Sequence, residues 1–148
     1  MNRRLSSTSV SKKELVLSDP IVSSSQTPSK GALWTGRVLT GLVGFGLIAS
    51  AAGKLSKAPA VIEGFGKFGF AEGLIRPIGL VELLSIVLYL VPKTRFFGAI
   101  LVTAYLGGAV CTHVRNGEPF VAPILLGVFA WAGLTLRDPR IRDLVTRP

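Results

Sequence analysis

Four long apolar stretches occupy most of the chain after residue 30, and they constrain its fold more than any other feature. They cover about residues 33–55, 74–91, 96–114 and 121–136. A transmembrane helix needs about 20 predominantly apolar residues. The mean hydropathy is +0.53 and only 17% of the residues are charged, whereas a typical soluble domain has about 25%. The pattern predicts an all-α protein that spans a membrane with four helices.

The chain divides into a tail and one domain. Residues 1–30 are rich in serine and threonine, and such a segment cannot bury enough apolar surface to order itself. We therefore predict a disordered tail at residues 1–30 and a four-helix transmembrane domain at residues 31–148. The chain after the fourth span is expected to be a short basic tail.

The connections between the spans predict the topology. Residues 92–95 and 116–119 are short, turn-forming connections, which force neighbouring helices to be antiparallel. The expected architecture is an up-down-up-down four-helix bundle. The long connection, residues 56–73, is interpreted either as a short interfacial helix or as a re-entrant turn.

Small residues recur at four-residue spacing on two of the spans. They are Gly36, Thr40 and Gly44 on the first span, and Ala99, Thr103, Gly107 and Cys111 on the third. In lipid, such a face lets helix backbones approach closely. Packing within the bundle, with Cys111 as a packing residue, is the simpler interpretation; a seam between two copies of the chain is the alternative.

The charge distribution points to a membrane orientation rather than to nucleic acid. The net charge is +9, but the basic residues flank apolar segments and form no stripe interleaved with aromatic residues. Of the 17 basic residues, 12 lie on the side that holds both termini. The positive-inside rule therefore predicts that both termini are cytoplasmic.

Cysteine and histidine usage limits the chemistry. The chain has one cysteine and one histidine, which excludes an internal disulfide, a C-x-x-C motif and a four-ligand Cys/His metal site. We expect no metal and no intrinsic cofactor, so any redox role would need a borrowed cofactor.

Four polar side chains from three spans fall near the same end of the bundle, opposite the termini. Lys54 ends the first span, Glu82 lies about two turns into the second, and His113 lies near the end of the third. Tyr105, two turns before His113, reaches a depth similar to that of Glu82. These four residues are the candidate ligand-binding site.

The role of this group has more than one interpretation. A carboxylate in hydrocarbon is costly unless it is paired or protonated, so Glu82 should face the interior with Lys54 as its partner. The pair is either a structural lock on helix register or part of a site for a ligand, proton or ion, and a protonated, unpaired Glu82 is a third possibility. His113 is either an interfacial residue or a proton shuttle.

Several short motifs resemble the DoxX-like family of small four-helix membrane proteins. They are Gly53-Lys54, residues 79–83 (GLVEL), residues 105–109 (YLGGA), residues 112–115 (THVR), residues 131–134 (WAGL) and residues 136–138 (LRD). The resemblance covers about residues 34–145. It implies a link to membrane redox complexes, because the family is named after a subunit associated with thiosulfate:quinone oxidoreduction. It also implies a bacterial plasma (inner) membrane.

Three functions remain open at this point. The first is an accessory subunit of a membrane redox system, which binds a quinone and works with a membrane or peripheral partner protein. The second is a non-catalytic scaffold or assembly protein whose polar cluster is structural. The third is a small-solute transporter, which would require a homo-oligomer because four short helices leave little room for a pore. A stand-alone enzyme is not expected, since no nucleophile–base pair or metal set is evident.

Overall fold

The computed structural model of the chain describes residues 29–146, with side chains through residue 143, and all of its regular structure is helical. The elements are α1 (Lys30–Leu55), α2 (Pro59–Lys67), the 3₁₀ turn η2 (Glu72–Leu74), α3 (Ile75–Leu90), α4 (Arg95–Arg115), α5 (Val121–Arg137) and α6 (Pro139–Thr146). The four long helices confirm the all-α fold class. The predicted disordered tail lies almost wholly outside the described residues.

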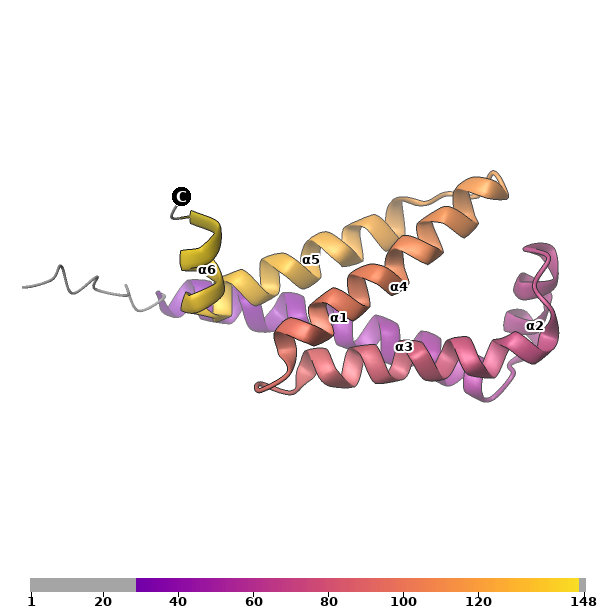
Figure 1. Ribbon diagram of the computed structural model, residues 1–148, viewed down its shortest axis with the longest axis horizontal. Helices are drawn as coiled ribbons and strands as arrows, with labels where there is room; N and C mark the ends of the chain where they lie inside the picture. The colour runs from indigo at the N-terminus through magenta and orange to yellow at the C-terminus, as the bar shows by residue number, and fades with distance from the viewer. Residues whose placement is uncertain (1–28, 147–148) are drawn as a thin grey trace, which may run out of the picture.

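The four long helices run alternately up and down (Figure 1). Helix α1 packs against α3 and α5, and α4 packs against the same two helices from the other side. Each long helix therefore has two neighbours, in the cyclic order α1, α3, α4, α5. This is the predicted up-down-up-down bundle.

The bundle is not parallel-sided. In Figure 1, the α1–α3 pair and the α4–α5 pair diverge from one end of the molecule like the arms of a V. We call the end that holds residues 91–94 and α6 the closed end, and the end that holds α2 the open end. The sequence did not predict this divergence of the two helix pairs. The divergence creates the space in which the candidate site lies.

Close backbone contacts hold the closed end together. Gly36 of α1 and Gly133 of α5 face each other, and a Cβ added at Gly133 would lie 3.2 Å from the Gly36 carbonyl oxygen. Where α3 meets α4, a Cβ added at Gly98 would collide with the backbone of Leu88 and Tyr89. Only glycine allows the helices to cross this closely.

The small-residue faces have different roles. Gly36, Thr40 and Gly44 are buried between helices, as expected for packing within the bundle. On α4, by contrast, Gly107 has no neighbouring atom within 4 Å of an added Cβ, and Cys111 is exposed. The prediction that Cys111 is a packing residue is therefore wrong, because this part of the α4 face lies outside the contacts between the long helices.

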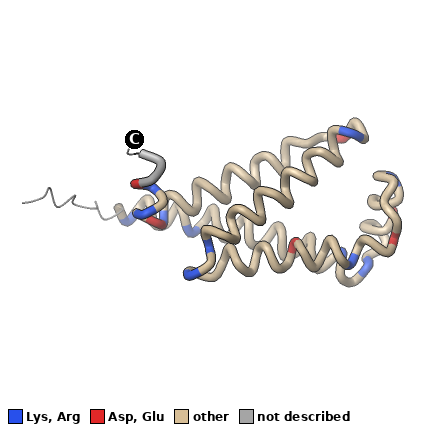
Figure 2. The backbone as a smooth tube through the Cα atoms, in the orientation of Figure 1, with Lys and Arg blue, Asp and Glu red and all other residues tan. Residues whose placement is uncertain are grey.

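The outer surface of the bundle is apolar. Large side chains such as Phe45 and Leu80 are 78% and 60% exposed, whereas the buried polar or charged residues include Thr40, Glu82 and Ser85. Figure 2 shows the charged residues gathered mainly toward the two ends of the bundle. This arrangement suits a surface in contact with lipid, since soluble monomers rarely expose large contiguous apolar patches. The chain is an integral membrane protein.

Length and composition suffice for three helices to cross a membrane. They are Lys30–Leu55, Glu72–Leu90 and Arg95–Arg115, while the apolar α5 is shorter, with 17 residues. Seventeen residues lie at the lower limit of the range for a spanning helix. The expected basic tail after α5 instead forms α6, and Ile141 of α6 packs into the core.

Candidate functional site

A buried ion pair joins α1 and α3 where the bundle begins to open. Lys54 Nζ lies 3.0 Å from Glu82 Oε2, and the two side chains are 12% and 1% exposed. The same ammonium donates a hydrogen bond to the hydroxyl of Ser50, one turn earlier on α1. This confirms that Glu82 faces the interior with Lys54 as its partner.

A glycine on α3 makes this contact possible. A Cβ added at Gly79 would lie 2.8 Å from Lys54 Cβ. Gly79 lies nearly one turn before Glu82 and on the same side of α3, so α1 and α3 approach closely just where the lysine must reach the carboxylate. The spacing G-x-x-E is therefore a local requirement of the ion pair.

Tyr105 brings α4 into the same group. The Lys54 ammonium is 6.0 Å from the centroid of the Tyr105 ring, and the phenol interacts with the Glu82 carboxylate. Three of the four predicted site residues thus meet at one point, and each comes from a different helix.

His113 lies farther out along α4. It is eight residues beyond Tyr105, or about 12 Å along the helix. Its ring packs edge-on against Phe68, with ring centroids 5.4 Å apart, and its Nδ1 atom is buried without a hydrogen-bond partner among the described residues. The structure therefore separates His113 from the ion pair, although both line the same cavity.

This cavity has a volume of about 540 Å³ and lies between the arms of the V. Its lining is mainly apolar. The polar groups in the lining are Ser50, Lys54, Glu82, Tyr105, Thr112 and His113. Five elements contribute to the wall: α1, α2, α3, α4 and α5, together with Phe68 and Phe70 from the segment after α2. A small number of polar groups in an apolar cavity is typical of a site for a small molecule.

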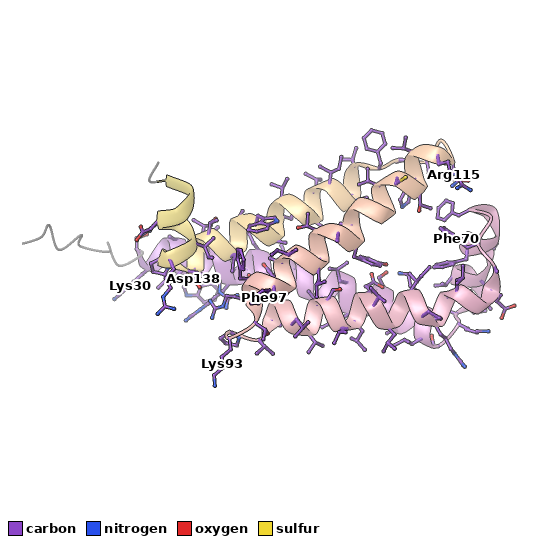
Figure 3. All side chains as sticks on the ribbon, in the orientation of Figure 1. Lys30, Phe70, Lys93, Phe97, Arg115 and Asp138 are labelled. Atoms are coloured by element: carbon purple, nitrogen blue, oxygen red, sulfur yellow. The ribbon has the colours of Figure 1, made fainter. Side chains whose placement is uncertain are left out.

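Aromatic residues of the long connection cover the open end. Phe65, Phe68 and Phe70 all line the cavity, and the rings of Phe65 and Phe70 pack together at 5.6 Å. Figure 3 shows Phe70 on the α2 side of the opening and Arg115 at the tip of α4 on the other side. No role was predicted for these phenylalanines, although three aromatic residues within six positions of a connection between two spans were a detectable signal.

The polar groups at the base of the cavity are hydrogen-bond donors and acceptors. Among the residues that the structure describes, no group of three His, Cys, Asp or Glu side chains could hold a metal ion. The base of the cavity offers a cation, a carboxylate and a phenol within a few ångströms of one another. Such a group can donate hydrogen bonds to a carbonyl and accept one from a hydroxyl.

Comparisons with known proteins give one match. The model of the DoxX-like family matches residues 38–133, roughly two thirds of the chain. Glu82, Lys54, Tyr105 and His113 all lie within this matched segment. No curated protein and no solved structure matches the chain.

Proposed function

Because this chain belongs to the DoxX-like family, we propose that it is an accessory subunit of a membrane redox system and that it binds a quinone-like molecule in the cavity at the open end. One observation carries the proposal. It is the polar group of Lys54, Glu82 and Tyr105 at the base of an otherwise apolar cavity inside a membrane protein.

The size and polarity of the cavity fit a lipophilic ring with a polar head. Small-molecule pockets usually measure about 300–1,000 Å³ and are lined mainly by apolar and aromatic side chains. The 540 Å³ of this cavity falls within that range. Phe65 and Phe68 offer aromatic edges and faces to a flat ring, and the lipid-exposed outer surface would accommodate an isoprenoid tail.

The hydrogen-bonding groups suit both oxidation states of a quinone. The Lys54 ammonium and the Tyr105 hydroxyl are donors for a quinone carbonyl oxygen, whereas the Glu82 carboxylate accepts a hydrogen bond from a quinol hydroxyl. His113 Nδ1, which is buried and unpartnered among the described residues, offers a second polar contact toward the opening. In this role the chain holds the quinone, and a membrane or peripheral partner protein carries out the electron transfer.

The charges of the described residues support an orientation. The closed end carries Lys30, Arg37, Lys93, Arg95, Arg137, Arg140 and Arg142 with Asp138 and Asp143. The open end carries fewer basic residues, namely Lys54, Lys57, Lys67, Arg76 and Arg115. Under the positive-inside rule the closed end is cytoplasmic, so the cavity opens toward the outer face of a bacterial plasma membrane.

A scaffold function is the second candidate, and the ion pair itself favours it. Lys54 and Glu82 satisfy each other within the protein, so they could fix the register of α1 on α3 without any ligand. Transport by a single chain is less well supported, because the glycine contacts between α1 and α5 and between α3 and α4 close the other end of the bundle.

The test is to identify the small molecules that leave the membrane with the protein. The wild-type chain and Glu82→Gln are purified in mild detergent, and the co-extracted lipids are measured by mass spectrometry. Glu118→Gln is the matched control, because it makes the same chemical change at an exposed residue outside the cavity. Helicity and elution volume establish that each variant is folded.

We expect a near-stoichiometric quinone in the wild type and in Glu118→Gln, and its loss in a folded Glu82→Gln. Glutamine keeps the size of the side chain but removes the charge that holds the Lys54 ammonium in place. A folded Glu82→Gln that retains the quinone would refute the site. Phospholipid alone in the wild-type extract would favour the scaffold function.

A further inference from the structure

Three arginines from three helices converge at the closed end, away from the cavity. Arg37 lies on α1, Arg95 is the first residue of α4 and Arg137 is the last residue of α5. Arg95 reaches across to α5, since its Nη1 lies 4.0 Å from Oδ2 of Asp138, the residue after Arg137. The positive-inside rule accounts for basic residues at this end, but it does not require arginines from three helices to lie at one helix junction.

The packing of α1 on α5 fixes the position of Arg137. A Cβ added at Gly36 would lie 2.6 Å from Arg137 Cγ, so the absence of a side chain at residue 36 makes room for the arginine stem. Arg37 follows Gly36 directly and is exposed. The backbone of Arg37 therefore lies at the same α1–α5 crossing as the stem of Arg137.

The acidic groups of the described residues compensate this charge only partly. Arg95 Nη1 is 4.0 Å from Asp138 Oδ2, and Arg95 Nε donates to the Pro92 carbonyl oxygen. No carboxylate of the described residues lies within ion-pair distance of Arg37 or Arg137. At the open end the structure pairs three lysines with three glutamates, while Arg76 and Arg115, on different helices, have no ion pair among the described residues.

The cluster lies where the apolar surface ends. Arg37 precedes the apolar part of α1, while Arg95 begins and Arg137 ends an apolar helix. Trp34, which is 68% exposed, and Phe97, which is 66% exposed, lie at the same end. Exposed tryptophan is typical of the level of the lipid headgroups.

We propose that Arg37, Arg95 and Arg137 form a binding site for the phosphate group of an anionic phospholipid. Guanidinium groups bind phosphate through paired hydrogen bonds, and a phosphate would relieve the mutual repulsion of the three arginines. The acyl chains would lie along the exposed apolar surface beside the cluster. The positive ammonium of a zwitterionic headgroup would be repelled, so an anionic lipid should bind more tightly. This site is independent of the cavity at the open end.

The experiment compares three phosphate-containing compounds on the full chain in an uncharged detergent. Phosphatidylglycerol, phosphatidylcholine and inorganic phosphate are titrated, and bound lipid is counted by native mass spectrometry alongside the melting temperature. Arg37→Gln and Arg137→Gln are the test variants. Arg115→Gln, which removes an arginine at the open end, is the control.

Phosphatidylglycerol should raise the melting temperature of the wild type and of Arg115→Gln, whereas the other two compounds should not. Its affinity for Arg37→Gln and Arg137→Gln should fall about tenfold or more, as expected when one charge-assisted hydrogen bond is lost. Arg37 is exposed, so its variant keeps the test available even where Arg137→Gln does not fold. Unchanged affinity in a folded Arg37→Gln, equal binding of phosphatidylcholine, or an equal effect of inorganic phosphate would each overturn the proposal.

Discussion

The glycine contact between α1 and α5 yields a quantitative prediction for Gly133→Ala. A Cβ added at Gly133 would lie 2.8 Å from Thr40 Oγ1 and 3.2 Å from both the Thr40 amide nitrogen and the Gly36 carbonyl oxygen. Nonbonded heavy atoms are optimally separated by about 3.5–4.0 Å. The methyl group therefore forces α1 and α5 apart by roughly half an ångström or more, because two of the three clashes involve backbone that cannot rotate away.

Two opposing effects set the change in the free energy of unfolding. Overpacking of a close-packed interior costs about 1–3 kcal/mol. Replacing glycine by alanine in a helix gains up to about 1 kcal/mol of helix propensity. We expect Gly133→Ala to lower the free energy of unfolding by about 0.5–2 kcal/mol after both terms are counted.

Gly107→Ala is the matched control, because it has the same gain in propensity and nothing lies within 4 Å of the added methyl group. Unfolding is followed by circular dichroism as the mole fraction of sodium dodecyl sulfate in mixed micelles is raised. Gly133→Ala should be about 1–3 kcal/mol less stable than Gly107→Ala, which is the steric cost alone. Equal stability of the two variants would refute the close crossing of α1 and α5.

Two further changes test the core and the long connection. Tyr89→Phe removes a buried hydroxyl that donates to the Ala130 carbonyl oxygen at 2.8 Å, so the free energy of unfolding should fall by about 0.5–1.5 kcal/mol in the same titration; an unchanged midpoint would show that this hydrogen bond contributes nothing. In α2, the Lys67 ammonium lies 2.9 Å from Glu63 and lowers the pKa of that carboxyl. The pair therefore stabilises α2 at any pH above the usual glutamate pKa of about 4.3, and this stabilisation is lost as the pH falls through the lowered pKa. Titration of the Glu63 carboxyl by NMR should give a midpoint below the usual one, and Lys67→Met should restore it; a midpoint that Lys67→Met does not move would contradict the pairing.

Hydropathy predicted the four long helices because a spanning segment must be apolar over nearly its whole length. The depth of Glu82 and Lys54 followed from counting helical turns, and that is why their pairing could be expected from the sequence. The divergence of the helix pairs could not be predicted in this way. It depends on which glycines meet across the bundle, and Gly36, Gly98 and Gly133 look no different in the sequence from Gly107.

The candidate site was predictable only in part for the same reason. His113 and Tyr105 share α4, but spacing along one helix cannot show how far α4 leans away from α3. The phenylalanines of the long connection come into position through the path of the chain after Lys57, whose φ of 52° turns the backbone from α1 into α2. The packing of α6 on the core through Ile141 depends on similar tertiary detail. The ligand-binding role of Lys54, Glu82, Tyr105 and His113 remains a prediction.

The pairing of Lys54 with Glu82 within one helical hairpin has a consequence for biosynthesis. During synthesis α1 and α3 emerge first, and together they already contain both charges. A charged side chain within a membrane-spanning helix is costly, and pairing the Glu82 carboxylate with the Lys54 ammonium reduces this cost before α4 and α5 have been made. The hairpin of α1 and α3 can therefore enter the bilayer by itself. Assembly is completed when the hairpin of α4 and α5 packs against it at the glycine contacts of the closed end.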